Sequence, residues 1–561
     1  MLLKRFLILL QALIIFSLIV ISPVALAITI AENGSAKAIV VVAEKAPEPV
    51  QHAAVELANF LGQISRAEFK VTNTSTNSEG RLLVGPQAAK LADADFSTDG
   101  LGSDGIIIRT VNNDLILAGG HPRGTLYAVY TFLEEHLGCR WWTSTECTIP
   151  ERSIIEVNDL NIRYVPVLEY RESFWYDALD GDWAVRNKSN GNSERLDAKR
   201  GGKHAYEGFV HTFYRLIPPD EHFTEHPEWF SEINSQRKHE SAQLCLSNEE
   251  MLKELVKNLK DRLRKNPAAT IASVSQNDWR GNCECRRCTA IDAEEGSPAG
   301  SLIRFINAVA ADIEEEFPNV AISTLAYQYT RKPPKVTKPR HNVIVRLCSI
   351  ECSFSKPLAN ERNREFRDDI IGWSKVSERL YVWDYVTNFR HHILPHPNLR
   401  VLAPNVKFFV EHGVKGIFEQ GAYTTNGAEM SELRAWVLAK LLWNPSLDGE
   451  KLIDEFLDGY YGPAAARRIR TYINFIHDEV EKTADWLGCF ADIAASNVKV
   501  SWATEDRSKF ITLESMSKSL SYFKAAERET ADEPELRFRV QCAQLPVMYA
   551  FIMCWNPMRE R

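Results

Sequence analysis

TIASVSQND, residues 270–278, joins an apolar, β-branched run to an abrupt polar end. A run of this length and composition predicts a buried β-strand. Asn277 and Asp278 stand where the strand stops. In a parallel barrel, the carboxyl ends of the strands form the active face. The stretch therefore predicts a barrel strand with a carboxylate at its mouth, although Asp278 could equally cap the loop that follows.

The same pattern of strand, loop and helix recurs from residue 165 to residue 421. Continuous apolar strands that alternate with helices predict a parallel sheet covered on its outside. Seven or eight such units predict an α/β fold, a (β/α)8 TIM-type barrel over residues 161–427. An open doubly wound sheet is the alternative, disfavoured because no glycine-rich phosphate turn is present. The candidate strands are 165–172, 241–247, 270–278, 320–330, 342–351, 379–388 and 414–421, with an eighth near 205–214.

Two further domains flank the predicted barrel. Residues 28–160 read as a small α/β domain, in which two strand-like runs are separated by Asn112-Asn113, a hairpin signal. Residues 428–561 carry helical periodicity broken by proline and glycine, which predicts a C-terminal helical domain. We expect both to support the barrel.

The first residues predict export. Lys4 and Arg5 precede a long apolar run and the small-x-small pattern Ala25-Leu26-Ala27, typical of a signal peptide over residues 1–27. An uncleaved anchor is the alternative.

The net charge of −8, which becomes more negative after cleavage, and the lack of a basic block exclude nucleic acid as a partner. No later stretch is apolar enough for stable membrane insertion, and the sequence does not indicate an oligomeric state.

Several predicted strands end in carboxylates with aromatic residues between them. Two carboxyl groups supply acid, base or nucleophile in glycoside hydrolysis, and rings stack on sugar faces. The catalytic candidates are Asp278, Glu419, Glu351, Asp384 and Asn277. The substrate-binding candidates are Arg171, Trp175, His204, His211, Tyr327, Tyr329, Trp383, Tyr385, Asn388 and Gln420.

These residues also have structural interpretations. Glu351 could pair with Arg171 or Arg346, and Asp384 could orient an arginine. The aromatic residues could be ordinary barrel packing, since aromatics suit strands regardless of function. Glu419 follows two apolar residues, and a buried carboxylate is costly unless it is used or paired.

Three cysteines crowd into the loop after Asp278. Cys283, Cys285 and Cys288 form a C-x-C-x2-C cluster, and tetrahedral zinc would require a fourth ligand. Cys245, Cys348 or Cys352 could supply it if the loops meet. In an exported protein a disulfide is equally compatible with the pattern. With either zinc or a disulfide, we expect the cysteine cluster to hold in place the loop that follows Asp278.

The segments SVSQNDWRGNCECRRC, LAYQYTRKPPK, VIVRLCSIEC, YVWDYVTNF and GVKGIFEQG resemble the bacterial DUF4838 family. That family is grouped as glycoside hydrolase family 163, whose characterised members are endo-β-N-acetylglucosaminidases acting on complex N-glycans. GRLLVGP and LILAGGHPRGTLYAVYTFLEEHLGCRWW resemble the domain before the barrel in family 67 α-glucuronidases and family 20 hexosaminidases. The resemblance implies a bacterial glycosidase that acts on a glycan. Together with the leader segment it predicts an exported enzyme that requires no cofactor, and the cysteine cluster makes a structural zinc the one metal to consider.

The resemblance also implies two mechanisms. In a substrate-assisted scheme the 2-acetamido group is the nucleophile, with Asn277 polarising it and Asp278 as acid. Family 20 has Asp followed by Glu at this place, so the pair differs here. In an inverting, family 67-like scheme, Glu351, Asp384 or Glu419 would be the base. An α-glucuronidase-like exo-hydrolase is the alternative activity, for which Arg171 is the obvious basic residue. A non-catalytic carbohydrate-binding protein would follow if the carboxylates fail to converge.

Overall fold

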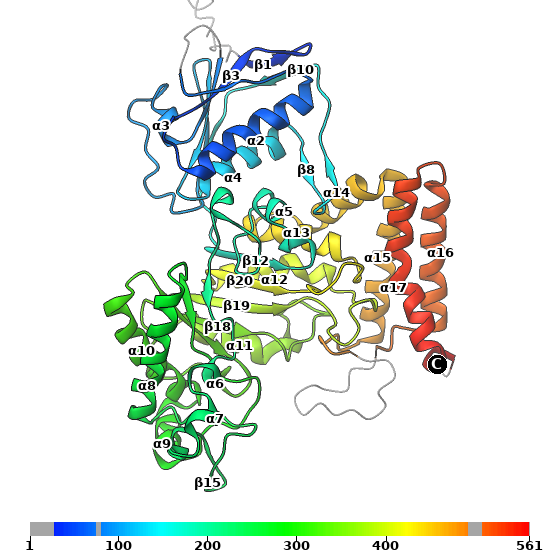
Figure 1. Ribbon diagram of the computed structural model, residues 1–561. Helices are drawn as coiled ribbons and strands as arrows, with labels where there is room; N and C mark the ends of the chain where they lie inside the picture. The colour runs from blue at the N-terminus through cyan, green and yellow to red at the C-terminus, as the bar shows by residue number, and fades with distance from the viewer. Residues whose placement is uncertain (1–26, 75–79, 492–507, 560–561) are drawn as a thin grey trace, which may run out of the picture. The chain divides into compact units, whose positions relative to one another are not determined.

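The computed structural model describes residues 27–74, 80–491 and 508–559, so the expected signal peptide lies almost wholly outside them. The chain divides into two compact units (Figure 1). The first runs up to Gly138 and includes Ile149–Tyr164, and the second holds Cys139–Thr148 and everything from Val165 onward. Among the described helices, none has the length and apolarity needed to cross a membrane.

The first unit is a mixed sheet with helices on its faces. Its strand order is β11-β6-β7-β5-β3-β4, and Val111 pairs with Asp114, which confirms the hairpin at Asn112-Asn113. Helices α2 and α4 lie side by side against the sheet (Figure 1). A small three-stranded sheet, β10-β1-β2, completes the unit. The bounds are β1 Ile28–Glu32, β2 Ser35–Ala36, β3 Ala38–Val42, α2 Glu48–Ser65, β4 Val71–Thr72, β5 Gly80–Val84, α3 Pro86–Ala89, β6 Ile106–Val111, β7 Asp114–Gly119, α4 Gly124–Thr131, β10 Ile154–Val157 and β11 Asn161–Tyr164.

The second unit is built on a curled parallel sheet of seven strands. The order is β12-β20-β19-β18-β17-β16-β13, and every neighbouring pair is parallel. Neighbours follow chain order and β20 returns to β12, the topology of a barrel, whereas a doubly wound sheet reverses direction at a switch point. The bounds are β12 Tyr170–Phe174, β13 Tyr206–Glu207, β16 Ile271–Ser273, β17 Ala321–Ala326, β18 Val343–Cys348, β19 Leu380–Tyr385 and β20 Gly416–Gln420.

A single residue connects the two edge strands of this sheet. The backbone N–H of Asn190 donates to the Arg171 carbonyl at 3.1 Å, and the N–H of His204 donates to the Asn190 carbonyl at 3.0 Å. The Asn190 side chain also accepts from the Arg171 N–H at 2.9 Å. Asn190 thus occupies the place of an eighth strand between β12 and β13.

The predicted strand at residues 241–247 is wrong. This segment makes one isolated bridge, from Leu244 to Phe230, and lies outside the barrel sheet. The backbone N–H of Gln243 donates to the Gly281 carbonyl instead. The segment belongs to a small cysteine-containing lobe with the hairpin β14 Glu232–Ile233 and β15 Gln236–Arg237. The strand near 205–214 takes its place in the sheet as β13.

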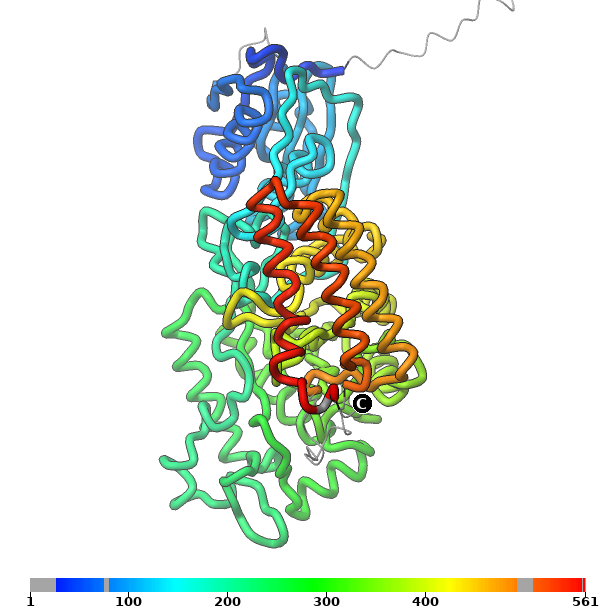
Figure 2. The backbone as a smooth tube through the Cα atoms, turned by 90° about the vertical axis from the view of Figure 1, so that its right-hand side faces the viewer, coloured from blue at the N-terminus to red at the C-terminus, as the bar shows by residue number. Residues whose placement is uncertain are grey.

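Helices cover the outside of the barrel and continue into the C-terminal region. Figure 2 shows α15, α16 and α17 packed side by side, and the Tyr472 and Phe523 rings of α15 and α16 lie 4.6 Å apart. The bounds are α8 Glu249–Lys265, α9 Arg286–Glu295, α10 Ala299–Glu316, α11 Arg364–Trp373, α12 Leu399–Glu411, α13 Ser431–Trp443, α14 Gly449–Tyr461, α15 Pro463–Thr483, α16 Leu513–Glu529 and α17 Pro534–Arg559.

The barrel lumen is filled around one arginine. Arg346 of β18 is fully buried, and its guanidinium lies 5.1–5.8 Å from the centres of six aromatic rings. These rings belong to Tyr170, Tyr206, Phe209, Tyr381, Trp383 and Phe418. Because side chains alternate along a strand, this contact set identifies the inward-facing positions of β12, β19 and β20.

Candidate active site

A pocket of about 290 Å³ lies at the carboxyl ends of the barrel strands. We call it the barrel-mouth pocket. Its polar lining includes Asp278, His211 and Gln420, and its rings include Tyr327, Trp383 and Tyr385. Leu325, Cys348, Ile350, Val210, Phe389 and Phe490 complete it. Six of the predicted site residues therefore meet in one place.

Asp278 is the only carboxylate among the described residues that line this pocket. Its side chain is 61% exposed, and Oδ1 accepts a hydrogen bond from the Tyr327 hydroxyl at 3.0 Å. The Nε2 atom of His211 lies 3.8 Å from the same oxygen. Asp278 thus offers an accessible carboxyl group that the Tyr327 hydroxyl orients, with the His211 ring beside it.

The loop that carries His211 has an unusual backbone. Val210 and His211 have φ angles of 50° and 55°, which β-branched and bulky residues rarely adopt. The loop is held by the N–H of His211, which donates to Ser275 Oγ at 2.9 Å, and by its Nδ1, 2.8 Å from the Gln276 carbonyl oxygen. Such conformations concentrate at functional sites, and both residues line the pocket.

Gln420 presents an amide to the pocket in a fixed orientation. The indole N–H of Trp383 donates to Gln420 Oε1 at 2.7 Å. Because this contact occupies the amide oxygen, the Gln420 NH₂ group is the part left to donate to a ligand. The Trp383 ring is held in turn by Phe209 and Phe418, with centroids 5.6 and 4.7 Å away.

Two predicted catalytic carboxylates point away from the pocket. Asp384 and Glu419 are register partners on β19 and β20, and they alternate with the inward-facing Trp383 and Phe418. Asp384 accepts from the Ser349 hydroxyl and from the Tyr385 N–H at 3.0 Å, and it hydrogen-bonds Asn405 of α12. Both carboxylates lie between the sheet and the helices. Their positions therefore do not support the prediction that they are catalytic residues at the barrel mouth.

This outward pair is electrostatically unusual. Asp384 and Glu419 are each 1% exposed, and neither oxygen of Glu419 has a hydrogen-bond partner among the described residues. Burial raises the pKa of Asp384 to about 6. Burial, together with the charge of Asp384, raises the pKa of Glu419 well above its usual value. Burial therefore favours the neutral form of Glu419 in the folded protein.

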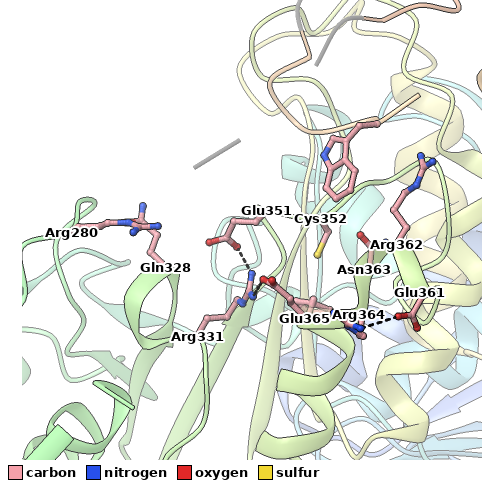
Figure 3. A pocket seen from close by; sticks show the side chains of 12 residues that line it. Arg280, Gln328, Arg331, Glu351, Cys352, Glu361, Arg362, Asn363, Arg364 and Glu365 are labelled. Atoms are coloured by element: carbon pink, nitrogen blue, oxygen red, sulfur yellow. Dashed lines mark hydrogen bonds and ion pairs between the residues drawn. The ribbon is translucent and has the colours of Figure 1, made fainter. Parts of the chain in front are cut away.

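Glu351 lies in a larger, charged pocket next to the barrel mouth. This arginine-lined pocket has a volume of about 610 Å³ (Figure 3). Glu351 accepts from Arg331 at 3.2 Å, and Arg331 also contacts Glu365 at 3.0 Å and Asp369 at 2.6 Å. The two pockets are neighbours. Tyr327 and Ile350 line the barrel-mouth pocket, and the residues that directly follow them, Gln328 and Glu351, line the arginine-lined pocket. The other lining residues are Arg280, Cys352, Glu361, Arg362, Asn363, Arg364, Phe366 and Trp486.

Asn277 is committed to the protein backbone. Its Nδ2 donates to the Ala242 carbonyl at 3.2 Å, and its Oδ1 accepts from the Tyr214 N–H at 3.4 Å. The side chain is 3% exposed. These contacts favour a structural role over polarising a substrate amide.

Five predicted binding residues also lie outside the barrel-mouth pocket. Arg171 faces the outer helices, where it contacts the Lys188 and Leu168 carbonyls and the Trp443 ring. Trp175 is buried against Gly421, where a Cβ would clash with its ring. His204 precedes β13 and packs on Tyr170 near the amino ends of the strands. Tyr329 lines a small cavity beside Cys283 and Cys288, and Asn388 donates to the Ala491 carbonyl at 2.8 Å.

Four cysteine side chains meet in the lobe behind Asp278. Cys245 joins Cys283, Cys285 and Cys288, and all four sulfur atoms lie within 4.8 Å of one another. Cys245 is thus the fourth cysteine that the spacing within the loop lacked. Cys348 and Cys352 line the two pockets instead.

Comparison with known proteins identifies the family. Residues 141–474, more than half of the chain, match the model described as Domain of unknown function (DUF4838). The chain belongs to the DUF4838 family. Residues 28–132 match the model described as Glycosyl hydrolase family 67 N-terminus. The resemblances to the DUF4838 family and to the N-terminal domain of family 67 are confirmed. No curated protein matches this DUF4838 chain by sequence.

Solved structures show where this DUF4838 fold has been seen before. A family GH115 4-O-methyl-α-glucuronidase with specificity for decorated arabinogalactans matches with a TM-score of 0.55 and 11% identity, covering 94% of this chain and 78% of its own. A GH138 enzyme targeting pectin rhamnogalacturonan II matches with a TM-score of 0.45 and 11% identity, covering 93% and 87%. The match to the GH115 enzyme shows that this DUF4838 protein has the fold of a glycoside hydrolase, and its N-terminal domain is of the family 67 type.

Sequence reasoning missed some residues of the site. Phe389 directly follows the candidate strand 379–388, so its position next to a predicted strand end could have identified it. Phe490 and Trp486 come from the region after α15, far along the chain from the strand ends whose pockets they line, and no local signal places them there. Arg280 and Arg331 stand in the loops after Asp278 and Tyr327 and could have been found as loop polar residues.

Proposed function

We propose that this protein is an exported glycoside hydrolase that cleaves a β-N-acetylglucosaminyl linkage in complex glycans by substrate-assisted catalysis. One observation carries the proposal. The barrel-mouth pocket, among the described residues, has one carboxylate, Asp278, surrounded by rings. Most glycosidases need two carboxyl groups at the scissile bond, but a sugar whose own acetamido group is the nucleophile needs only an acid and an orienting group.

Asp278 is the proton donor in this scheme. A bound sugar would exclude water from its carboxyl group, which favours the neutral form that a general acid requires. The Tyr327 hydroxyl, 3.0 Å from Oδ1, holds the carboxyl group toward the pocket. After cleavage the carboxylate takes a proton from the water that opens the cyclised intermediate.

Gln420 orients the substrate amide, replacing Asn277 in that role. Its NH₂ group can donate to the acetamido carbonyl, while the Trp383 indole holds its oxygen. Leu325, Ile350 and the Trp383 ring offer apolar surface to the acetamido methyl group. Tyr385 and Phe389 add ring faces on which a pyranose can stack.

The stereochemistry of the product tests this mechanism. We expect hydrolysis of aryl β-N-acetylglucosaminides or N-glycans with retention at the anomeric carbon, observed by proton NMR before mutarotation. A substrate whose acetamido group is replaced by hydroxyl should not be cleaved. Inversion, or equal rates on both substrates, would contradict substrate assistance.

The arginine-lined pocket favours one second candidate, an inverting hydrolase of uronic acid glycosides. Arg280 is exposed at its edge, and Arg331, Arg362 and Arg364 line it (Figure 3). Such a set suits a sugar carboxylate. Glu351 would then be the base. In that case Arg280→Ala should raise KM for uronides at least about tenfold, and Glu351→Gln should abolish activity. The substrate-assisted scheme predicts that Glu351→Gln remains active.

A further inference from the structure

We infer that Cys245, Cys283, Cys285 and Cys288 form a structural zinc site that fixes the loop carrying Asp278. The four residues come from two separate segments, 245 alone and 283–288 together. All four are buried, between 2% and 7% exposed. This inference concerns metal binding and stands whether or not the proposed function is correct.

The distances between the sulfur atoms match a metal tetrahedron. A zinc–sulfur bond of about 2.3 Å places tetrahedral sulfur ligands about 3.8 Å apart. The Sγ atom of Cys245 lies 3.7 Å from that of Cys285 and 3.9 Å from that of Cys288. A disulfide would require about 2.05 Å between two sulfur atoms. Each cysteine stays close to all three others, whereas disulfides would sort them into pairs.

Groups around the cluster can support negative sulfur ligands. The backbone N–H of Glu232 donates to Cys283 Sγ at 3.3 Å, and Arg237 approaches the same sulfur at 3.6 Å. Cys285 is the residue that caps the start of α9, where the helix dipole favours negative charge. Four thiolates around Zn²⁺ carry a net charge of −2, and these groups offset part of it.

The site joins two segments whose contact positions Asp278. Gln243, two residues before Cys245, accepts from the Asn277 N–H at 2.9 Å. Its Nε2 donates to the carbonyls of Asn277 and Trp279 at 3.1 and 2.6 Å. Gln243 therefore grips the backbone on both sides of Asp278. Removal of the metal would allow the two segments to separate and these Gln243 hydrogen bonds to weaken.

Metal analysis of the full-length protein tests the inference. We expect about one zinc ion per chain by mass spectrometry of the metal content, in the wild type and in the control Cys542→Ser, whose thiol is exposed. Cys285→Ser and Cys245→Ser should each lose most of the zinc. Because such variants can unfold, circular dichroism is recorded for each. The zinc content of the wild type tests the site even where a variant does not fold.

Other results would overturn the site. Bound iron, two disulfides seen as a mass loss under non-reducing conditions, or four metal-free thiols would each contradict it. The coupling to Asp278 has its own readout and rests on the proposed function. Stripping zinc with a strong chelator should lower kcat and leave KM within about threefold, and added zinc should restore kcat. Zinc present with kcat unaffected by its removal would disprove the coupling alone.

Discussion

Asp384 on β19 and Glu419 on β20 are direct register partners, and both carboxylates face the helices outside the barrel. Each follows an inward-facing aromatic residue, Trp383 and Phe418, by one position. The strand alternation therefore removes two of the four predicted carboxylates from the substrate side. Asp278 stays in the barrel-mouth pocket and Glu351 in the pocket beside it.

Substitution of the outward carboxylates should spare activity. We expect Asp384→Asn and Glu419→Gln to keep kcat within about threefold of the wild type, because neither side chain reaches the pocket. Asp278→Asn should lower kcat by about 10²–10⁴-fold, the usual contribution of a general acid. Asp368→Asn, an exposed aspartate on α11, is the control. Loss of activity in a correctly folded Glu419→Gln variant would show that Glu419 belongs to the active site.

The same pair should make stability depend on pH. The folded state keeps Glu419 protonated, whereas the unfolded chain releases the proton at its ordinary pKa of 4.5. Folding stability is therefore intact below that pH and is lost progressively as the pH rises. Glu419→Gln removes this loss, so it should be more stable than the wild type at pH 7 and nearly equal to it at pH 4.

Denaturant unfolding at both pH values measures that gain. Glu411→Gln, on the exposed side of α12, should show no such pH-dependent difference. An equal gain at pH 4 and pH 7, or a loss at pH 7, would mean that Glu419 is not held neutral.

Gln420 should govern recognition of the acetamido group. Gln420→Leu leaves the substrate carbonyl without its donor, and an unpaired buried polar group costs about 1–3 kcal/mol. We expect kcat/KM for N-acetyl substrates to fall about 10–100-fold. Trp383→Phe keeps a ring but loses the N–H that orients Gln420, so it should lose less. Cleavage of N-acetyl substrates at the wild-type rate by Gln420→Leu would exclude this role.

Gln243 should act as a positioning residue. Gln243→Leu removes all three hydrogen bonds to the backbone around Asp278. We expect kcat to fall about tenfold or more with KM nearly unchanged, because sugar contacts remain while the acid shifts. Gln243→Asn keeps both the amide donor and the amide acceptor on a shorter side chain and should recover part of kcat. Equal losses in kcat for both variants, accompanied by unfolding, would indicate a purely structural role.

The barrel was predictable because its signals are local. Apolar strands alternating with helices, and the Asn112-Asn113 hairpin, are properties of neighbouring residues, and the structure contains them in the expected order. Residues at or just after the carboxyl end of a strand can be located in the same way, which is why Asp278, Tyr327 and Trp383 were found. The short segment 241–247 misled this reasoning because its apolar residues serve the cysteine lobe and not the sheet.

The chain by itself determined the seven strands of the barrel sheet and the residues near their carboxyl ends, with 241–247 wrongly added, because periodicity and turn residues act over a few positions. Only the tertiary structure decided which of two adjacent residues, Trp383 or Asp384, faces the lumen, since that depends on how the sheet curls and on the register of its partner strands. It also brought Cys245 to the other three cysteines and Phe490 over the barrel mouth. Contacts between residues so far apart in sequence form only when the whole barrel and its loops have packed.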